Sequence, residues 1–200
     1  MSIAHLLKLM GQLGLPVNHE TPLPLLHRAA TLGSIDVRQS AYVYVLLLLA
    51  KFSHVTVPDH LFKPFIPPSS FEGTGKHLER AAYFNFAPAR CKLGHAYEFT
   101  QPPFSFEPLL SIHYYSLASQ QSEIEADVAL SKWLLCGADG NFENDEALTF
   151  AEKAAGKGLL SAEFALGYYA EVGVGGPKDI ELARKWYTRV SSFLQQRFLR

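Results

Sequence analysis

The chain has 200 residues, and its 18 basic side chains nearly balance its 19 acidic ones, which gives a net charge of −1 with histidine neutral. This balance offers no basic surface for nucleic acid or for anionic lipid. Hydrophobic residues make up 48% of the chain and charged residues 18%, which excludes the composition of a disordered protein. The composition therefore predicts a folded, soluble protein of one domain or one short repeat array.

Signals for secretion, membrane insertion and disulfide formation are missing from the pattern. The two cysteines, Cys91 and Cys136, are too few for a disulfide framework and belong to no CxxC pair. The first 15 residues lack the long apolar stretch and cleavage site of a signal peptide. The longest apolar run, residues 41–50, is about half the length that a membrane span needs. We therefore expect a cytoplasmic protein without a transmembrane segment or prenyl anchor, associated with a membrane only through a partner.

The first expected element is a helix over about residues 3–13. Ile3, Leu6, Leu7 and Met10 form an i, i+3, i+4, i+7 stripe, and glycines follow it. A second pattern follows, His27-Arg28-Ala29-Ala30, which closes with a pair of small residues that ends at Ala30. We predict an irregular first hairpin over residues 1–33.

The second expected unit, residues 34–86, contains an insertion at about residues 51–75. Its closing small-residue pair ends at Ala82, 52 residues after Ala30, whereas later units are shorter. Four prolines within the insertion argue against a long helix there. Insertions in repeat arrays often project from one face and contact partners. The interpretation that we favour here is a packed loop whose aromatic residues cover its own unit.

Three more units follow, over residues 87–122, 123–158 and 159–200. Their closing small-residue pairs end at Ser119, Ala155 and Ser191, at separations of 37, 36 and 36 residues counted from Ala82. In the last unit, Ala162, Leu166 and Ala170 form one helical stripe beside a glycine, which favours close helix packing. Gly173 is expected to end this helix and Asp179 to cap the next one.

One such hairpin cannot bury its apolar face alone, so the units must stack. The pattern predicts an all-α fold: a right-handed αα superhelix, or solenoid, of about five helical hairpins in a single domain spanning residues 1–200.

This pattern resembles the Sel-like repeat family, whose members are related to tetratricopeptide repeats. The resemblance covers roughly residues 21–191 and is strongest over Ala162–Gly175, Asp179 and Trp186-Tyr187. Ala170 stands where the family usually has tyrosine, and Ser131 replaces the usual glycine of the fourth unit. Segments such as His113-Tyr114-Tyr115 and Gly158–Tyr168 are similar to fungal members that activate chitin synthase.

The resemblance implies a non-enzymatic adaptor for a protein partner in fungal cell-wall synthesis, namely a chitin synthase subunit. It implies a position at the cytoplasmic side of the plasma membrane, at the bud neck or septum. Fungal relatives that bind a cell-cycle kinase share the repeats, so a kinase-binding regulator of mitosis is the alternative function and a regulatory kinase the alternative partner.

In tetratricopeptide-like hairpins the first helix of each unit lines a concave groove, and that geometry implies a partner-binding groove here. The alternative is that Phe164, Val128 and Phe99 only pack between repeats. The expected groove residues are Ser161, Phe164, Tyr168 and Glu171 in the fifth unit, Glu125, Val128, Lys132 and Leu135 in the fourth, Cys91, His95, Glu98 and Phe99 in the third, and Tyr44, Leu48 and Lys51 in the second.

Catalytic and cofactor motifs are missing from the sequence. The eight histidines form no HExxH motif, and the glycines at 173–176 follow a predicted helix rather than a strand, so they fail the test for a phosphate-binding loop. His54, Asp59 and His60 are the nearest approach to a metal-ligand set. We therefore expect no enzymatic activity, cofactor or metal. An enzyme or metal protein that uses His54, Asp59 and His60 is a further alternative.

Overall fold

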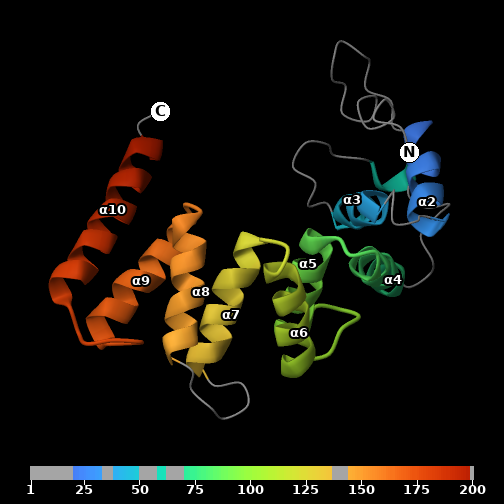
Figure 1. Cartoon of the computed structure of the whole chain (residues 1–200). Coiled ribbons are helices and arrows are strands. Elements are labelled where there is room, and N and C mark those ends of the chain that lie inside the picture. Colours follow the sequence, from blue (N-terminus) through green and yellow to red (C-terminus); the bar gives the residue numbers. More distant parts are fainter. Residues whose placement is uncertain (1–19, 33–37, 50–57, 62–69, 137–143, 199–200) are drawn as a thin grey trace. The chain divides into compact units, whose positions relative to one another are not determined.

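The computed structural model describes residues 20–32, 38–49, 58–61, 70–136 and 144–198. These ranges contain nine α-helices, one short 3-10 helix and no β-strand, which confirms the predicted all-α class (Figure 1). The elements are α2 (Pro22–Leu32), α3 (Arg38–Leu48), η2 (Asp59–Leu61), α4 (Ser70–Tyr83), α5 (Ala87–Glu98), α6 (Pro108–Ser119), α7 (Ile124–Cys136), α8 (Asn144–Gly156), α9 (Leu160–Val172) and α10 (Ile180–Phe198).

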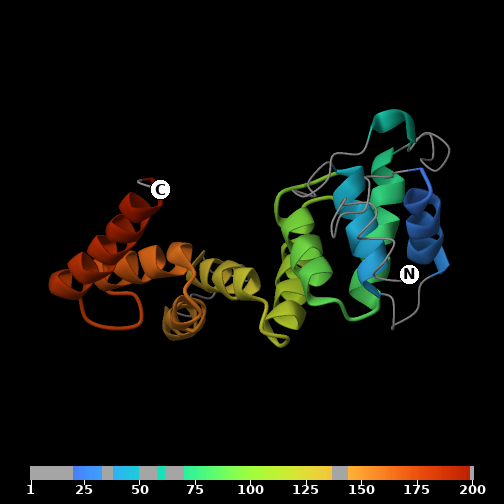
Figure 2. The same ribbon diagram turned by 90° about the horizontal axis from the view of Figure 1, so that it is seen from above.

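The chain divides into two compact units, residues 1–107 and 108–200. In the first unit α2 packs on α3, α3 on α4, and α4 on α5. In the second unit α6 packs on α7, and α7, α8, α9 and α10 follow one another side by side (Figure 2). The single domain over residues 1–200 stays a prediction.

Each of the last three predicted repeats spans two helices, while the boundaries of the repeats stay a prediction. Residues 87–122 contain α5 and α6, residues 123–158 contain α7 and α8, and residues 159–200 contain α9 and α10. The expected helix at residues 3–13 lies outside the described residues, as does most of the insertion. The described part of the insertion differs in one respect from the expectation, because α4 begins at Ser70 and includes the last residues assigned to the insertion.

The turns that lead from one predicted repeat to the next have the same geometry. Asn85, Ser122 and Gly158 each adopt a positive φ, of 62°, 67° and 82°. In each turn the following residue donates its N–H to a carbonyl five residues earlier, as Glu123 does to Ala118 at 3.2 Å. This is the pattern that satisfies the last carbonyls of a helix before the chain reverses.

The loop inside the last hairpin also follows the sequence prediction. Gly173 ends α9 in the left-handed conformation with φ 84°, and its N–H donates to the Tyr169 carbonyl. Asp179 precedes α10, and its Oδ1 accepts the N–H of Leu182 at 2.9 Å. Both predicted helix signals are therefore confirmed.

The core of the second unit is built from small residues between helices. Ala147, Ala151, Ala154 and Ala162 are buried, together with Leu166 and Tyr169. A Cβ added to Gly167 would stand 2.6 Å from the ring of Tyr187, so only glycine lets α10 approach α9 this closely.

Ser131 occupies the corresponding position one repeat earlier, and Ala151 occupies the position that corresponds to Tyr187. The missing ring leaves room for the serine side chain. Its hydroxyl donates to the Ala147 carbonyl at 2.6 Å and lies 2.8 Å from the Tyr169 hydroxyl. The departure from glycine at Ser131 is therefore matched by a smaller neighbour and a hydrogen bond.

The aromatic loop after α5 packs on its own unit. A Cβ at Gly75 would stand 2.6 Å from Cγ of Pro103, and the ring of Phe104 lies 5.0 Å from that of Tyr97. This loop therefore packs against α4 and α5.

Candidate protein-binding surface

An exposed apolar stripe runs along α9. Phe164, Tyr168 and Val172 lie at i, i+4 and i+8, which places them on one face of the helix. Their exposed fractions are 57%, 46% and 38%. The opposite face of α9 contributes Ala162, Leu166 and Tyr169 to the core. Large apolar side chains aligned on an exposed face are typical of a surface that another helix covers.

Tyr187 of α10 supports this stripe from the side. Its ring centroid lies 5.3 Å from that of Phe164, and its hydroxyl donates a hydrogen bond to Oε2 of Glu171 at 2.8 Å. Burial raises the pKa of the Tyr187 hydroxyl, and the hydrogen bond to the Glu171 carboxylate raises it further. Glu171 and Tyr187 also line a pocket of about 460 Å³ along α10. Tyr187 thus contacts both Phe164 and Glu171.

The expected groove residues of α7 divide between surface and core. Glu125 and Lys132 are exposed, and Leu135 is half-buried. Val128 is only 7% exposed and packs into the core with Ala147 and Leu166. Val128 therefore cannot contact a partner as expected, because its side chain fills the space between helices.

The expected groove residues of α5 include one exposed aromatic side chain. Phe99, which follows the last residue of α5, is 57% exposed, and its ring lies 4.4 Å from that of His95. Nδ1 of His95 is 3.0 Å from Nε2 of Gln101. Glu98 is half-buried, whereas Cys91 is buried and is a core residue rather than a groove residue.

The expected groove residues of the second predicted repeat, residues 34–86, are not exposed where the structure describes them. Tyr44 of α3 is 1% exposed, and its ring meets those of His27 and His77 at centroid distances of 5.2 and 5.0 Å. Burial raises the pKa of the Tyr44 hydroxyl to about 12. Tyr44 is therefore a core residue rather than a groove residue. Leu48 is half-buried, and Lys51 lies outside the described residues.

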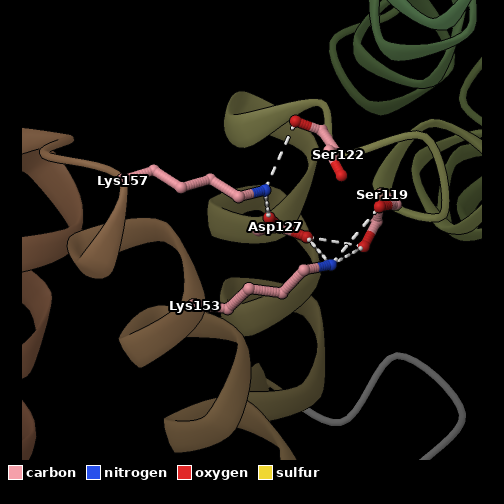
Figure 3. Close-up of polar contacts among 5 residues, drawn as sticks. All are labelled: Ser119, Ser122, Asp127, Lys153 and Lys157. Carbon is pink, nitrogen blue, oxygen red and sulfur yellow. Dashed lines mark hydrogen bonds and ion pairs between the residues drawn. The ribbon is translucent and has the colours of Figure 1, made fainter.

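A buried ion-pair cluster that the sequence prediction missed lies between α6, α7 and α8 (Figure 3). Asp127, in the first turn of α7, has a fully buried side chain. Its Oδ1 accepts hydrogen bonds from the Ser119 hydroxyl at 2.5 Å and from Lys153 Nζ at 2.8 Å. Lys157 Nζ reaches Oδ2 at 3.0 Å and the Ser122 carbonyl at 3.3 Å. One carboxylate thus joins three helices.

The charge of Asp127 is stabilised by these donors. Burial alone raises the pKa of the Asp127 carboxyl, but hydrogen bonds from Lys153, Ser119 and Lys157, with the charge of Lys153, outweigh it and hold the pKa below its ordinary value. The cluster therefore keeps a carboxylate ionised inside the core.

The last repeat carries a related pair. Glu163 stands 36 residues after Asp127, and Arg189 stands 36 residues after Lys153. Arg189 Nη2 lies 2.9 Å from Oε1 of Glu163, whose side chain is 3% exposed. An acidic residue directly after the first alanine of the motif, with a basic residue 26 positions later, is the sequence signal that could have found both pairs.

The described residues show no grouping of the kind that holds a metal. No three His, Cys, Asp or Glu side chains come together among them. His54, one member of the suggested metal set, lies outside these residues, so that alternative is not tested. Within the same described ranges, no helix combines the length and the apolar character needed to cross a membrane.

Comparison with known proteins defines the class of this fold. The model of the Sel1 repeat matches residues 87–123 and 160–190. A crystal structure of a protective antigen of uropathogenic Escherichia coli, described as displaying an SLR fold, superposes with a TM-score of 0.67 at 18% identity. The match covers 85% of this chain and 33% of that one. Two segments of the chain therefore match the Sel1 repeat, and the described residues have the all-helical fold of the superposed structure.

The similar curated proteins include fungal regulators of chitin synthase. "Chitin synthase regulator SKT5" of Malassezia restricta is 40% identical over 114 residues, which are 56% of this chain and 8% of the relative. "Chitin synthase regulator SKT5" of Saccharomyces cerevisiae is 30% identical over 186 residues, which are 90% of this chain and 25% of the relative. The chain thus spans a quarter or less of the length of these two relatives.

Proposed function

We propose that this chain is a non-enzymatic adaptor that regulates chitin synthase by binding a protein of the synthase complex. The observation that carries the proposal is the 30% identity to a chitin synthase regulator over 186 residues, because this alignment spans nearly the whole chain. The Sel1 repeats support it, since helical repeat arrays present extended surfaces for protein partners.

The α9 stripe is the surface that we assign to this partner. Phe164 and Tyr168 offer two large aromatic side chains, the residue type that contributes most to protein interfaces. Glu171 and Lys132, both exposed, add charges of opposite sign that would orient an incoming helix. We propose four further contacts with the partner: Leu135 of α7, and His95, Glu98 and Phe99 at the end of α5.

The adaptor is proposed to act at the cytoplasmic side of the plasma membrane, at the bud neck or septum, where its partner would hold it. The regulator relatives support a place beside the synthase. In this proposal the position is a consequence of the partner.

Affinity purification tests the proposal. The tagged chain is incubated with detergent-treated fungal extract, and captured proteins are identified by mass spectrometry. A chitin synthase subunit in the eluate is the expected result. A kinase in its place would overturn the synthase proposal in favour of a cell-cycle regulator, and an eluate without either would overturn both.

A double variant, Phe164→Ala with Tyr168→Ala, locates the surface. We expect loss of the captured subunit at an unchanged thermal midpoint, since both side chains are largely exposed. Leu182→Ala is the matched control, because Leu182 is 42% exposed on α10 and lies outside the stripe. Full capture by the double variant would exclude the α9 stripe as the binding surface.

A further inference from the structure

A second pocket, separate from the α9 stripe, lies between the start of α9 and the second half of α10. Its volume is about 290 Å³, and its lining includes Glu163, Arg189, Leu160 and Phe193. Leu160 is half-buried, and Phe193 is 50% exposed, so the pocket has an apolar wall at its mouth. Glu163 contributes a buried acidic group to the same lining.

The carboxylate of Glu163 is only half satisfied. Arg189 contacts Oε1 at 2.9 Å, whereas Oε2 is buried and accepts no hydrogen bond from the residues that the structure describes. Buried polar atoms almost always have a partner, and an ionised acceptor without one costs more than a neutral one. The pocket therefore contains a place for one more hydrogen-bond donor.

The preceding repeat shows which donor fits such a place. Asp127 occupies the position that corresponds to Glu163, and both of its oxygens are satisfied. Lys153, which corresponds to Arg189, contacts one oxygen, and Lys157 Nζ contacts the other at 3.0 Å (Figure 3). The residue that corresponds to Lys157 in the last repeat is Phe193. The ammonium that completes the cluster in one repeat is thus missing from the next.

We propose that this pocket binds a lysine side chain of a partner polypeptide, whose ammonium donates to Oε2 of Glu163. Leu160 and Phe193 would cover the methylene groups of the lysine, as apolar surfaces commonly do for this side chain. The charge of the complex would equal that of the Asp127 cluster, with two cations on one carboxylate.

This inference deepens the proposed function and rests on it for the identity of the partner. The binding chemistry is tested on the purified chain alone, with residues that differ from those of the α9 stripe. If partner capture fails, the lysine pocket can still be tested. If the lysine pocket does not bind the probe, the proposal for the α9 stripe is unaffected.

The first test supplies the missing ammonium from within the chain. Phe193→Lys should raise the midpoint of thermal unfolding by about 2 °C, the shift expected for a gain of one modest interaction in a chain of this size. The gain should vanish in a Glu163→Gln background. Gln195→Lys, which adds the same charge at an exposed neighbouring position, is the control. A gain that is equal in both backgrounds, or in the control, would overturn the proposal.

The second test uses a probe in solution. The isotope-labelled chain is titrated with N-acetyl-lysine N-methylamide, and its amide resonances are followed by nuclear magnetic resonance. We expect saturable shifts at the amides of Glu163, Arg189 and Phe193, and at least a fivefold weaker response in both Glu163→Gln and Phe193→Lys.

The corresponding norleucine probe has the same methylene groups without the charge. Equal shifts with norleucine would show a merely apolar pocket and overturn the proposal. Butylammonium that binds much more tightly than the blocked lysine would overturn the assignment to a polypeptide, since the peptide groups would then hinder entry.

Discussion

The hairpins α7–α8 and α9–α10 place an acidic residue and a basic residue at corresponding positions but satisfy the carboxylate to different degrees. Asp127 has Lys153, Lys157 and the Ser119 hydroxyl around it, and both oxygens have donors. Glu163 has only Arg189 among the described residues, and Oε2 has none. The repeated backbone thus determines where the charge lies, while a few side chains around it decide whether the site is closed or open to a further donor.

The largest expected effect comes from removing the charge of the closed site. Asp127→Asn should lower the free energy of unfolding by about 3 kcal/mol, because it breaks a buried ion pair and turns amide hydrogens toward two lysines. Urea denaturation of the whole chain measures this. The matched change, Glu163→Gln, should cost less than half as much, since it removes fewer hydrogen bonds. Equal losses would show that the two sites do not differ.

Removing the cation of the open site comes next. Arg189→Met leaves the buried Glu163 carboxylate without a counter-charge, and we expect a loss of about 2 kcal/mol, reduced from the value for fully buried pairs because Arg189 is 63% exposed. The contact of its guanidinium with the ring of Trp186, at 5.7 Å, is lost as well. Thermal unfolding at neutral pH measures the loss. A loss of the same size in a Glu163→Gln background would contradict the unpaired carboxylate as its cause.

Removing one of two cations should matter less. Lys157→Met leaves Lys153 and Ser119 on Asp127, so we expect a loss of about 1 kcal/mol, the contribution of a typical hydrogen bond. Urea denaturation of Lys157→Met and Arg189→Met in parallel compares the loss of one of two cations with the loss of a single cation. A loss larger than that of Arg189→Met would contradict the difference in redundancy between the two sites.

The smallest effect concerns the difference in free energy of unfolding between the wild type and Asp127→Asn, which we expect to change with pH. We call this difference the stability gap. The folded-state pKa of Asp127 lies below its unfolded value of about 3.9, so its contribution is complete above that pH and is lost as the pH falls through the folded pKa. Denaturation curves should therefore show a constant gap above about pH 5 that narrows below about pH 4.

Two histidines of the compact unit 1–107 also make the protein less stable in acid, but they leave the stability gap between the wild type and Asp127→Asn unchanged. Burial lowers the pKa of His27, and burial with the charges of His27 and Arg80 lowers that of His77. Their contribution falls as the pH drops below about 6.5, the ordinary value for histidine, and it falls equally in both proteins. A gap that narrows already at pH 6 would show that the histidines and Asp127 are coupled.

The helical framework was predictable because it depends on short-range signals. The spacing of Ala162, Leu166 and Ala170 defines one helical stripe, of which Ala162 and Leu166 are buried. Gly173 and Asp179 end and begin helices through local backbone chemistry. Such signals act within one or two helical turns, so the sequence alone contains them.

The predicted groove was less accurate, because exposure depends on neighbouring helices. Phe164 and Val128 occupy corresponding positions one repeat apart, yet the first is 57% exposed and the second 7%. The spacing places both on the first helix of a repeat, but only the packing of the surrounding helices distinguishes them. The ion pairs were missed for a related reason, since Asp127 and Lys153 look like ordinary surface charges until their helices are brought together.

The repeated left-handed turn has a consequence for how such chains change in length. Ser122 and Gly158 hold the same turn, and residues 123 and 159 make the same hydrogen bond back to the preceding helix. Excising residues 123–158 would join Ser122 directly to Leu159, whose N–H would then meet the Ala118 carbonyl as that of Glu123 does now. Because the same turn precedes and follows this hairpin, a deletion or duplication of the whole hairpin in the gene would preserve the connecting turn and its hydrogen bond.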